Sequence, residues 1–343
     1  MTGEIIQRDQ DRFHKGLLLS FITLFFVILF SLTIGQYVMT FSDSVMALMD
    51  VILQRHNSST STSVIGRIRL PRTIAAFIVG SCLSVSGGVY QSTFNNKLVS
   101  PDLLGVSAGA CVGAAVAILL GVNSYLISVF AFCFGVVSVF AALCLPRLFR
   151  NRSNLMLVLS GIIVGSFMDA ILGLIKYTAD REEKLAEITF WIMGELKGMT
   201  LGKIGSVLPI YMISMIGILA LRWRINIVSL GEDEAKSVGL NFKGCRLAII
   251  VFSTLLTAIS VSLCGNVGWI GLVVPHIVRA VFGADNRYSV PMSFLWGGTF
   301  MIIVDMISRN LSTSEIPLSI ITGIIGTVIY AIVLIKKGSK IHE

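Results

Sequence analysis

The sequence is dominated by a series of apolar runs, each close to the length needed to cross a lipid bilayer. A membrane-spanning helix needs about 20 predominantly apolar residues. Such runs lie at approximately residues 16–38, 73–93, 103–121, 124–145, 155–177, 203–222, 246–264, 269–283, 289–309 and 317–335. The eighth is short and contains Pro275, His276 and Arg279. Because lipid cannot hydrogen-bond an exposed backbone, these runs predict helices. The chain is therefore predicted to be an all-α integral membrane protein with about ten transmembrane helices.

The composition excludes a water-soluble fold. Hydrophobic residues make up 55% of the chain and charged residues only 13%, whereas soluble domains carry roughly 25% charged residues. The net charge of +8 does not indicate nucleic-acid binding, since membrane proteins concentrate Lys and Arg in cytoplasmic loops. The six cysteines form no CxxC pair and have no accompanying His cluster. We therefore predict no metal site.

The distribution of basic residues predicts that both termini are cytoplasmic. With this orientation, the inner segments hold 16 of the 27 Lys and Arg residues, the outer segments hold ten, and Arg279 lies within the eighth span. The first apolar run is too long for a signal peptide and has no small-residue cleavage site, so none is predicted. The predicted organisation is a cytoplasmic tail at 1–15, a ten-helix transmembrane bundle at 16–335 with a cytoplasmic loop at 223–245, and a cytoplasmic tail at 336–343.

Two outer segments have the pattern of short helices at the membrane surface. Residues 42–55 place Val45, Met49 and Ile52 on one helical face. Residues 180–200 mix charged residues with Phe190 and Trp191, which suit the membrane interface. Both segments are predicted to lie along the interface rather than to cross the bilayer.

The most informative loop is 229–241, with the sequence SLGEDEAKSVGLN. Ser229 followed by Glu232 matches a capping box, and Gly239 suits the residue after a helix end. The loop therefore predicts a helix of about two turns. Ala235 and Val238 give this helix a small apolar face without a core to cover it. Two interpretations remain open, namely an ordinary surface helix or a docking element for a soluble partner.

Small residues in the second span predict close helix packing. Gly80, Ser84, Gly87, Gly88 and Gln91 recur at helical spacing on one side. Residues 265–287 contain further glycines and Pro275, which disturb helical regularity. Irregular backbone at membrane depth is tolerated where protein buries it or where it lines a cavity.

Charges inside the apolar segments need partners or a polar path. Asp305 and Arg309 are spaced i,i+4, so we expect them to pair. Asp169 and Lys176 share a face of the fifth span, where they either line a polar path or pair within the bundle.

Three further arginines, Arg67, Arg69 and Arg72, precede the second span on the predicted outer face. With Arg309 they either form a basic surface that pairs with a partner's carboxylates or lie along the membrane interface.

These segments together resemble the iron-siderophore, haem and cobalamin permease family of ABC importers over about residues 60–335. The matching stretches are RLPRT at 69–73, G-x-x-L-x-x-S-G-x-x-x-Q at 80–91, PDLLGVSAGA at 101–110, LSG at 159–161, W-x-x-G at 191–194, LGEDEAKSVGL at 230–240, GLVVPHIVR at 271–279, D-x-x-x-R at 305–309 and EIP at 315–317. A P-loop is absent from the sequence, so ATP is not expected to bind this chain through that motif.

The resemblance implies a permease subunit that works by ATP-driven alternating access in a bacterial or archaeal plasma membrane. The expected partners are a second permease subunit (identical or paralogous), two cytoplasmic ATPase subunits carrying ATP and Mg, and an extracytoplasmic binding protein. By resemblance, the ATPase-coupling loop comprises Leu230, Gly231, Glu232, Ala235, Val238 and Gly239. Arg69, Arg72 and Arg309 are expected to face acidic residues of the binding protein. Asp169, Gln91 and Lys176 are candidates for the translocation path. No catalytic residue, cofactor or nucleic-acid partner is expected for this chain.

The expected substrate is an iron(III)-siderophore complex, with haem, cobalamin and an oxyanion as alternatives. Several positions depart from the family pattern, including Lys97, Glu195, Ser319 and Thr327. Ser319 and Thr327 lie on the tenth span, so these departures concern the shape of the path and leave the substrate open. A second class, an ion-coupled secondary transporter, would need carboxylates near the membrane midplane, where Asp169 and Asp305 are the candidates. An intramembrane enzyme is disfavoured because the four histidines show no metal-ligand spacing.

Overall fold

A computed structural model describes residues 2–53, 55, 59–148, 154–312 and 314–338, and these residues contain no β-strand. The long or apolar helices are α1 (Thr2–Thr33), α4 (Leu70–Thr93), α5 (Val106–Leu119), α6 (Ser124–Leu148), α7 (Asn154–Thr178), α9 (Leu201–Leu230), α11 (Phe242–Cys264), α12 (Ile270–Phe282), α13 (Asn286–Asn310) and α14 (Leu318–Gly338). The short elements are α2 (Phe41–Ile52), α3 (Thr60–Val64), the π-helical turn η1 (Ile65–Arg69), α8 (Lys184–Met193) and α10 (Glu232–Ser237).

Every predicted span coincides with a helix. Within the described residues, seven helices are long and apolar enough to cross a membrane, and three further apolar helices are shorter. The shorter helices are α5, α12 and α14, of which α12 corresponds to the interrupted eighth run. The prediction of an all-helical membrane protein is confirmed.

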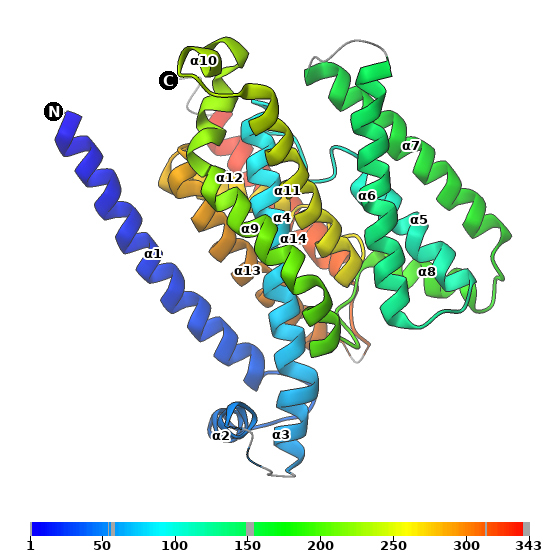
Figure 1. The fold of residues 1–343 in the computed structure, drawn as a ribbon. Coiled ribbons are helices and arrows are strands. Elements are labelled where there is room, and N and C mark those ends of the chain that lie inside the picture. Colours follow the sequence, from blue (N-terminus) through cyan, green and yellow to red (C-terminus); the bar gives the residue numbers. More distant parts are fainter. Residues whose placement is uncertain (1, 54, 56–58, 149–153, 313, 339–343) are drawn as a thin grey trace.

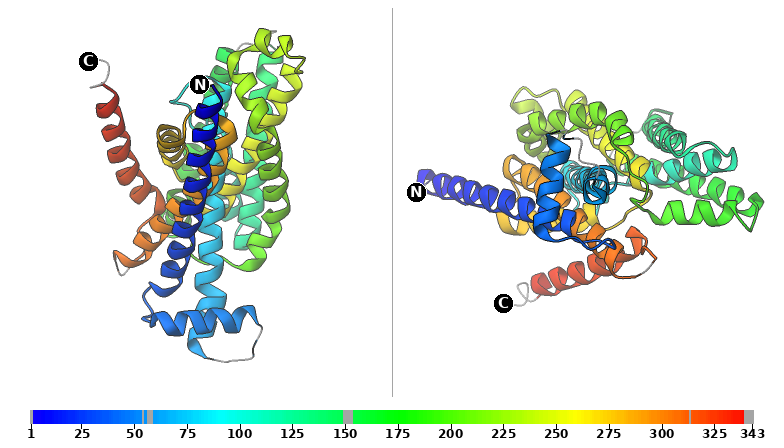
Figure 2. Two further views of the ribbon diagram at one scale, coloured as in Figure 1. Left: turned by 90° about the vertical axis from the view of Figure 1, so that its left-hand side faces the viewer. Right: turned by 90° about the horizontal axis from the view of Figure 1, so that it is seen from below.

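Helix α4 lies at the centre of the bundle. It packs against α13, α11, α12 and α9, and most of its residues are buried. Figure 2, seen from below, shows α4 nearly end-on with other helices on several sides. A helix surrounded by helices needs small side chains where its neighbours approach, which is the pattern predicted for this segment.

Glycines mark the closest contacts of α4. A Cβ atom on Gly80 would lie 2.1 Å from the carbonyl oxygen of Gly297, and one on Gly87 would lie 2.0 Å from that of Gly271. Gly88 faces Pro275 of α12. The predicted packing role of these residues is therefore confirmed: α13 and α12 approach α4 so closely that only hydrogen fits at two positions.

A Gly87→Ala variant is expected to lose about 3 kcal/mol of stability, because the new methyl group meets backbone atoms that cannot rotate away. Gly173→Ala on α7 is the matched control, since no atom lies within 4 Å of its added Cβ. The measurement is the thermal unfolding temperature of each purified variant. Equal unfolding temperatures for the two variants would contradict the packing described here.

Helices α5, α6 and α7 form a second group beside α11 (Figure 1). They pack chiefly on one another, and α11 contacts both this group and α4. Helix α7 contacts mainly α5 and α6, so its opposite side is left uncovered: Ile162, Ile163, Phe167, Leu174 and Tyr177 are exposed there. Helix α14 is also sparsely packed and exposes Ile324 and Ile335 among others.

The start of α1, the end of α14 and α10 lie at one end of the bundle, and α2 and α3 lie at the opposite end (Figures 1 and 2). We call these the inner and outer ends, following the predicted distribution of Lys and Arg. Both predicted surface segments contain helices. Helix α2 begins with a capping box between Thr40 and Asp43, and α8 falls within residues 180–200. Gln54, at the end of the first predicted segment, lies outside the described residues.

Several boundaries differ from those predicted. Helix α1 begins at Thr2 and ends at Thr33, so most of the predicted tail at 1–15 is helical and continuous with the first span. Helix α9 extends to Leu230 and removes much of the expected loop after residue 222. Hydropathy detects where lipid-compatible residues end, whereas a helix continues until a residue breaks its backbone. The predicted tail at 336–343 lies partly outside the described residues.

Candidate coupling and transport surfaces

Helix α10 is set apart from α9 by a single glycine. Gly231 has φ +124, a conformation that suits glycine, and serves as the residue before α10. The predicted capping box is wrong. Ser229 lies inside α9 and donates its hydroxyl proton to the carbonyl oxygen of Asn226 at 2.6 Å. No side chain caps the start of α10.

The end of α10 matches the prediction. The backbone N–H of Gly239, with φ +72, donates to the carbonyl oxygen of Lys236 at 3.0 Å. The N–H of Leu240 donates to that of Ala235 at 2.9 Å. These two bonds form a Schellman motif, which the glycine at this position predicts. The short helix is thus closed by its own backbone at its C-terminal end.

The predicted apolar face of α10 is only half correct. Val238 is 62% exposed and Leu230 is 67% exposed, but Ala235 is fully buried. Helix α10 packs against α9 and α11, and these two helices cover the side chain of Ala235. The exposed apolar surface at this end therefore comes from Leu230 and Val238, on either side of the helix.

The acidic first turn of α10 carries one defined ion pair. Glu232 lies 3.0 Å from the ammonium group of Lys236, one turn along the helix. The hydrogen bond from Lys236 lowers the pKa of the Glu232 carboxyl, and the nearby cations Lys243 and Arg246 act in the same direction. Glu232 is therefore ionised at neutral pH and presents a negative charge beside basic residues of α11.

A polar cluster at the inner end fixes α9 to the start of α13. The side-chain amide of Asn226 donates to Asp285 at 2.7 Å, and its carbonyl oxygen accepts the backbone N–H of Asn286 at 2.9 Å. Arg287 lies 2.6 Å from the Asp285 carboxylate. Burial opposes ionisation of Asp285, but hydrogen bonds from Arg287 and Asn226 outweigh it and lower the pKa of this carboxyl. The helix that leads to α10 is thus anchored to another part of the bundle.

We expect Asp285→Asn to reduce the stability of the chain by about 1 kcal/mol at neutral pH, a value kept low because the group is partly exposed. A lowered pKa in the folded state means that the ionised group stabilises the fold above its ordinary pKa near 4. That contribution is lost as the pH falls further, through the lowered pKa. Thermal unfolding from about pH 3 to pH 7 should show the two proteins converging in acid, and a difference that persists unchanged at pH 3 would refute this role.

Of the four outer arginines, Arg67 is exposed, but the other three are buried and so do not form the basic surface that was one of the two predicted alternatives. Arg69, Arg72 and Arg309 are 3%, 5% and 6% exposed. The predicted pairing of Asp305 with Arg309 is confirmed, with 3.1 Å between the carboxylate and the guanidinium. The same carboxylate also lies 2.7 Å from Arg72, which in turn lies 2.8 Å from Glu315. Asp305 thus joins α4 and α13 within one charged network.

Arg69 is held by backbone carbonyl groups instead of carboxylates. Its guanidinium donates to the carbonyl oxygens of Leu32 at 2.6 Å and Thr33 at 2.8 Å, and also to that of Tyr37. Carbonyl groups at the end of a helix have no partner within that helix. Arg69 therefore caps the end of α1. The sequence did not predict this role of Arg69 or the ion pair between Glu315 and Arg72. In both cases the two interacting groups lie far apart in the sequence.

Gln91 is hydrogen-bonded within the chain and also lines a cavity together with Arg279 and Asn226. It is 3% exposed, and its amide donates to the carbonyl oxygens of Val99 and Gly271, both at 3.2 Å. Its carbonyl oxygen accepts a hydrogen bond from Arg279. These contacts join α4 to α12 and to the chain before α5. The structure therefore shows a packing role for Gln91, and its assignment to the translocation path stays a prediction.

Asp169 is exposed on α7, and Lys176 is half-buried on the same helix. Asp169 lies on the sparsely packed helix whose exposed apolar residues are described above. Both residues remain candidates for a surface completed by another subunit.

Three basic residues line a common cavity, although the sequence analysis counted them only as inner charges. They are Arg147, Lys243 and Arg246. Among the described residues, no group of three His, Cys, Asp or Glu side chains is placed to hold a metal ion.

Comparisons with known proteins identify relatives along nearly the whole chain. Residues 23–336 match the profile of the FecCD transport family. The molybdate import system permease protein MolB of Haemophilus influenzae is 36% identical, covering 80% of this chain and 81% of MolB. A probable iron chelatin transport system permease protein of Helicobacter pylori is 36% identical, covering 80% of this chain and 83% of the relative.

One solved structure resembles the whole bundle. It is an inward-facing conformation of a metal-chelate type ABC transporter, with a TM-score of 0.85 and 33% sequence identity. The alignment covers 94% of this chain and 99% of that chain. The two structures therefore share both the order of the helices along the chain and their arrangement in space.

Proposed function

The chain belongs to the FecCD transport family of ABC importer permeases, and on that premise we propose that it moves an iron(III)-siderophore complex across a bacterial or archaeal plasma membrane. It is a multi-pass membrane subunit, and ATP hydrolysis belongs to a separate ATPase. The observation that carries the proposed mechanism is α10, a short helix closed by its own backbone at the inner end. It is joined to α9 through Gly231 and to α11 after Gly239.

The proposed role of α10 is to dock on the ATPase. Leu230 and Val238 supply exposed apolar contacts, and Glu232 supplies a charge. Helices α9 and α11, which flank α10 in sequence, continue into the bundle and both pack on α4. Movement of α10 by an ATPase would therefore be transmitted to the central helix. Such a displacement can shift the bundle between inward-open and outward-open arrangements if ATP binding favours one of them.

We propose that a second permease subunit covers the exposed sides of α7 and α14. Both helices pack sparsely within this chain and carry exposed apolar residues. A path between two subunits would then lie along them, with Asp169 and Lys176 as its polar residues. The second subunit is either a second copy, which forms a closed symmetric dimer, or a paralogue.

The outer end is the proposed docking face for the extracytoplasmic binding protein. Arg69, Arg72 and Arg309 lie beneath that face, where they join α1, α4 and α13. Arg67, on the turn η1, is exposed. In this proposal the three buried arginines keep the docking face in shape, and Arg67 offers a cation to the binding protein.

The substrate assignment rests on the relatives named for iron chelates and on the likeness to a metal-chelate transporter. MolB, a relative of equal identity, is named for molybdate, so an oxyanion is the strongest alternative. Haem and cobalamin complete the set of compounds to be tested. The exposed sides of α7 and α14 are mainly apolar, which suits a bulky organic chelate better than a small hydrated anion.

The test is uptake into liposomes that contain the permease with its ATPase, with the loaded binding protein outside and ATP inside. We expect ATP-dependent accumulation of a ferric siderophore. Preferential uptake of molybdate, haem or cobalamin would overturn the substrate assignment while leaving the transporter class intact. Uptake driven by a proton or sodium gradient without ATP would instead support an ion-coupled secondary transporter.

A further inference from the structure

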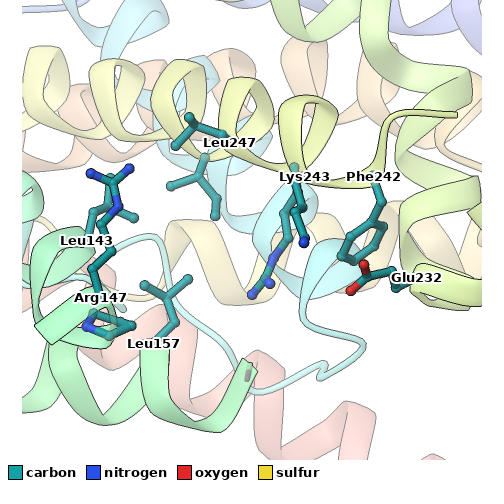
Figure 3. A pocket seen from close by; sticks show the side chains of 10 residues that line it. Leu143, Arg147, Leu157, Glu232, Phe242, Lys243 and Leu247 are labelled. Atoms are coloured by element: carbon teal, nitrogen blue, oxygen red, sulfur yellow. The ribbon is translucent and has the colours of Figure 1, made fainter. Parts of the chain in front are cut away.

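A cavity of about 380 Å³ lies at the inner end, between the end of α6, the start of α7, α10 and the start of α11. Figure 3 shows Lys243, Phe242 and Glu232 on one side of this cavity, with Arg147 and Leu157 opposite. Its walls combine aliphatic side chains with three cations, Arg147, Lys243 and Arg246. A cavity of this composition can accept the stem and the charged end of an anionic side chain.

The charge of the cavity is not balanced within the described residues. Glu232 is the single carboxylate that lines it, against three cations, and Glu232 is already paired with Lys236 at 3.0 Å. Lys243 and Arg246 also lie in the first turns of α11, whose N-terminal end carries positive partial charge. Cations at that end of a helix repel its dipole, so an additional anion would stabilise the arrangement.

Arg246 gives the clearest indication that this cavity binds an anion. Its Nε and one terminal nitrogen are shielded from solvent and have no hydrogen-bond acceptor among the described residues. Its guanidinium carbon lies 5.7 Å from the ring centre of Phe94 and 5.9 Å from that of Phe242. The rings hold the guanidinium in place without satisfying its N–H groups. A planar guanidinium fixed in this way is prepared for a carboxylate that accepts two hydrogen bonds.

We propose that this cavity receives an acidic side chain, Asp or Glu, of the ATPase subunit. The inference rests on the proposed function and adds to it a second docking point beside α10. The occupant is assigned from charge and position: the cavity is cationic, and its wall includes Glu232 of the coupling helix itself. Docking by α10 alone would let the ATPase pivot about one short helix. A carboxylate held between α6 and α11 would fix its orientation, and it would also connect the ATPase to the group formed by α5, α6 and α7.

A zero-length carbodiimide cross-link tests the contact directly. The reagent joins an ammonium group to a carboxylate only when the two touch, and Lys243 supplies the ammonium group. In the assembled permease–ATPase complex, we expect mass spectrometry to recover Lys243 linked to an Asp or Glu of the ATPase, and Lys243→Gln to remove that product. A Lys243 that never links to the ATPase in a stable complex would overturn the proposal.

Affinity measurements supply a second readout. Arg246→Gln is expected to weaken ATPase binding by about tenfold or more, as expected when one member of a shielded charge pair is lost. It should also reduce the sensitivity of binding to salt. Lys197→Gln, which makes the same charge change at an exposed outer position, should bind like the unaltered chain. Equal affinity and salt dependence for Arg246→Gln and Lys197→Gln would contradict the proposal.

Two further outcomes separate this inference from its premise. If the unaltered chain binds no ATPase, the proposed function fails together with the inference. If the ATPase binds but Arg246→Gln weakens it only in membranes that contain phosphatidylglycerol, and no cross-link forms, the anion is a lipid headgroup. That result would overturn the inference and leave the proposed function standing.

Discussion

A Glu232→Lys variant is expected to insert and fold but to lose ATP-driven transport. The substitution removes the partner of Lys236 and adds a cation beside Lys243 and Arg246. It also puts a positive charge in the first turn of α10, where a helix favours acidic residues. We expect the transport rate to fall by tenfold or more, since a charge at a docking surface is reversed. The measurement is ATP-dependent uptake by the reconstituted transporter.

Two control variants show whether the effect of Glu232→Lys depends on its position and on the sign of the charge. Glu182→Lys makes the same change at an exposed position near the outer end, and we expect it to transport normally. Glu232→Gln, which removes the charge without reversing it, should show an intermediate rate. Normal transport by Glu232→Lys would exclude α10 as the coupling element. An unfolding temperature far below that of the unaltered chain would show instead that the charge reversal acts on the fold.

An Asp305→Ala variant is expected to lose about 3–5 kcal/mol of stability. Asp305 is fully buried and lies between Arg72 and Arg309, at 2.7 Å and 3.1 Å. Removing the carboxylate leaves two buried guanidinium groups without their shared partner. The cost therefore comes chiefly from unpaired buried charge, not from lost packing. The measurement is the thermal unfolding temperature of the purified chain in detergent.

Removing one charge at the partly exposed edge of the same ion-pair network provides the control. Glu315 is 27% exposed, so Glu315→Gln is expected to cost less than about 1 kcal/mol. Replacing Arg72, Asp305 and Arg309 together by Met, Leu and Met should restore much of the lost stability, since apolar residues need no partner. If Asp305→Ala is as stable as Glu315→Gln, the network does not hold the outer end together.

The sequence was sufficient to predict features that depend on local chemistry. The predicted spans follow from runs of apolar residues, and each coincides with a helix. The close packing at Gly80 and Gly87 follows from small residues at helical spacing. Gly239 predicts the end of α10 because few other residues adopt its backbone conformation. In each case the determining atoms lie within a few residues of one another or repeat along one face.

The failures involve partners that are distant in the sequence. Arg72 and Asp305 are 233 positions apart, so the sequence left Arg72 either on a basic surface or along the membrane interface and did not show that it is buried in an ion pair. Gln91 meets the carbonyl oxygen of Gly271, which is 180 positions away. Ser229 illustrates a different failure. The S-x-x-E pattern was present, but α9 continued through Ser229 and ended at Leu230, before Gly231. Local motifs cannot show which of two competing helix boundaries the fold adopts.

The cavity beside α10 was missed for the same reason. Arg147 and Arg246 belong to different helices, and only the packing of α6 near α11 places them on one cavity. A weak signal was nonetheless present, since Lys243 and Arg246 occupy the first turns of α11. Basic residues are uncommon choices for that end of a helix, and their presence there indicates a nearby anion.

ATP hydrolysis by the assembled transporter tests the central claim most directly. The permease would be reconstituted with its ATPase in lipid nanodiscs, and hydrolysis measured with and without a binding protein loaded with ferric siderophore. The account predicts a stable complex whose hydrolysis rises when the loaded binding protein is added, and a Glu232→Lys complex that shows no such rise. An ATPase that fails to bind the unaltered chain, or that hydrolyses ATP at the same rate in both complexes, would contradict it.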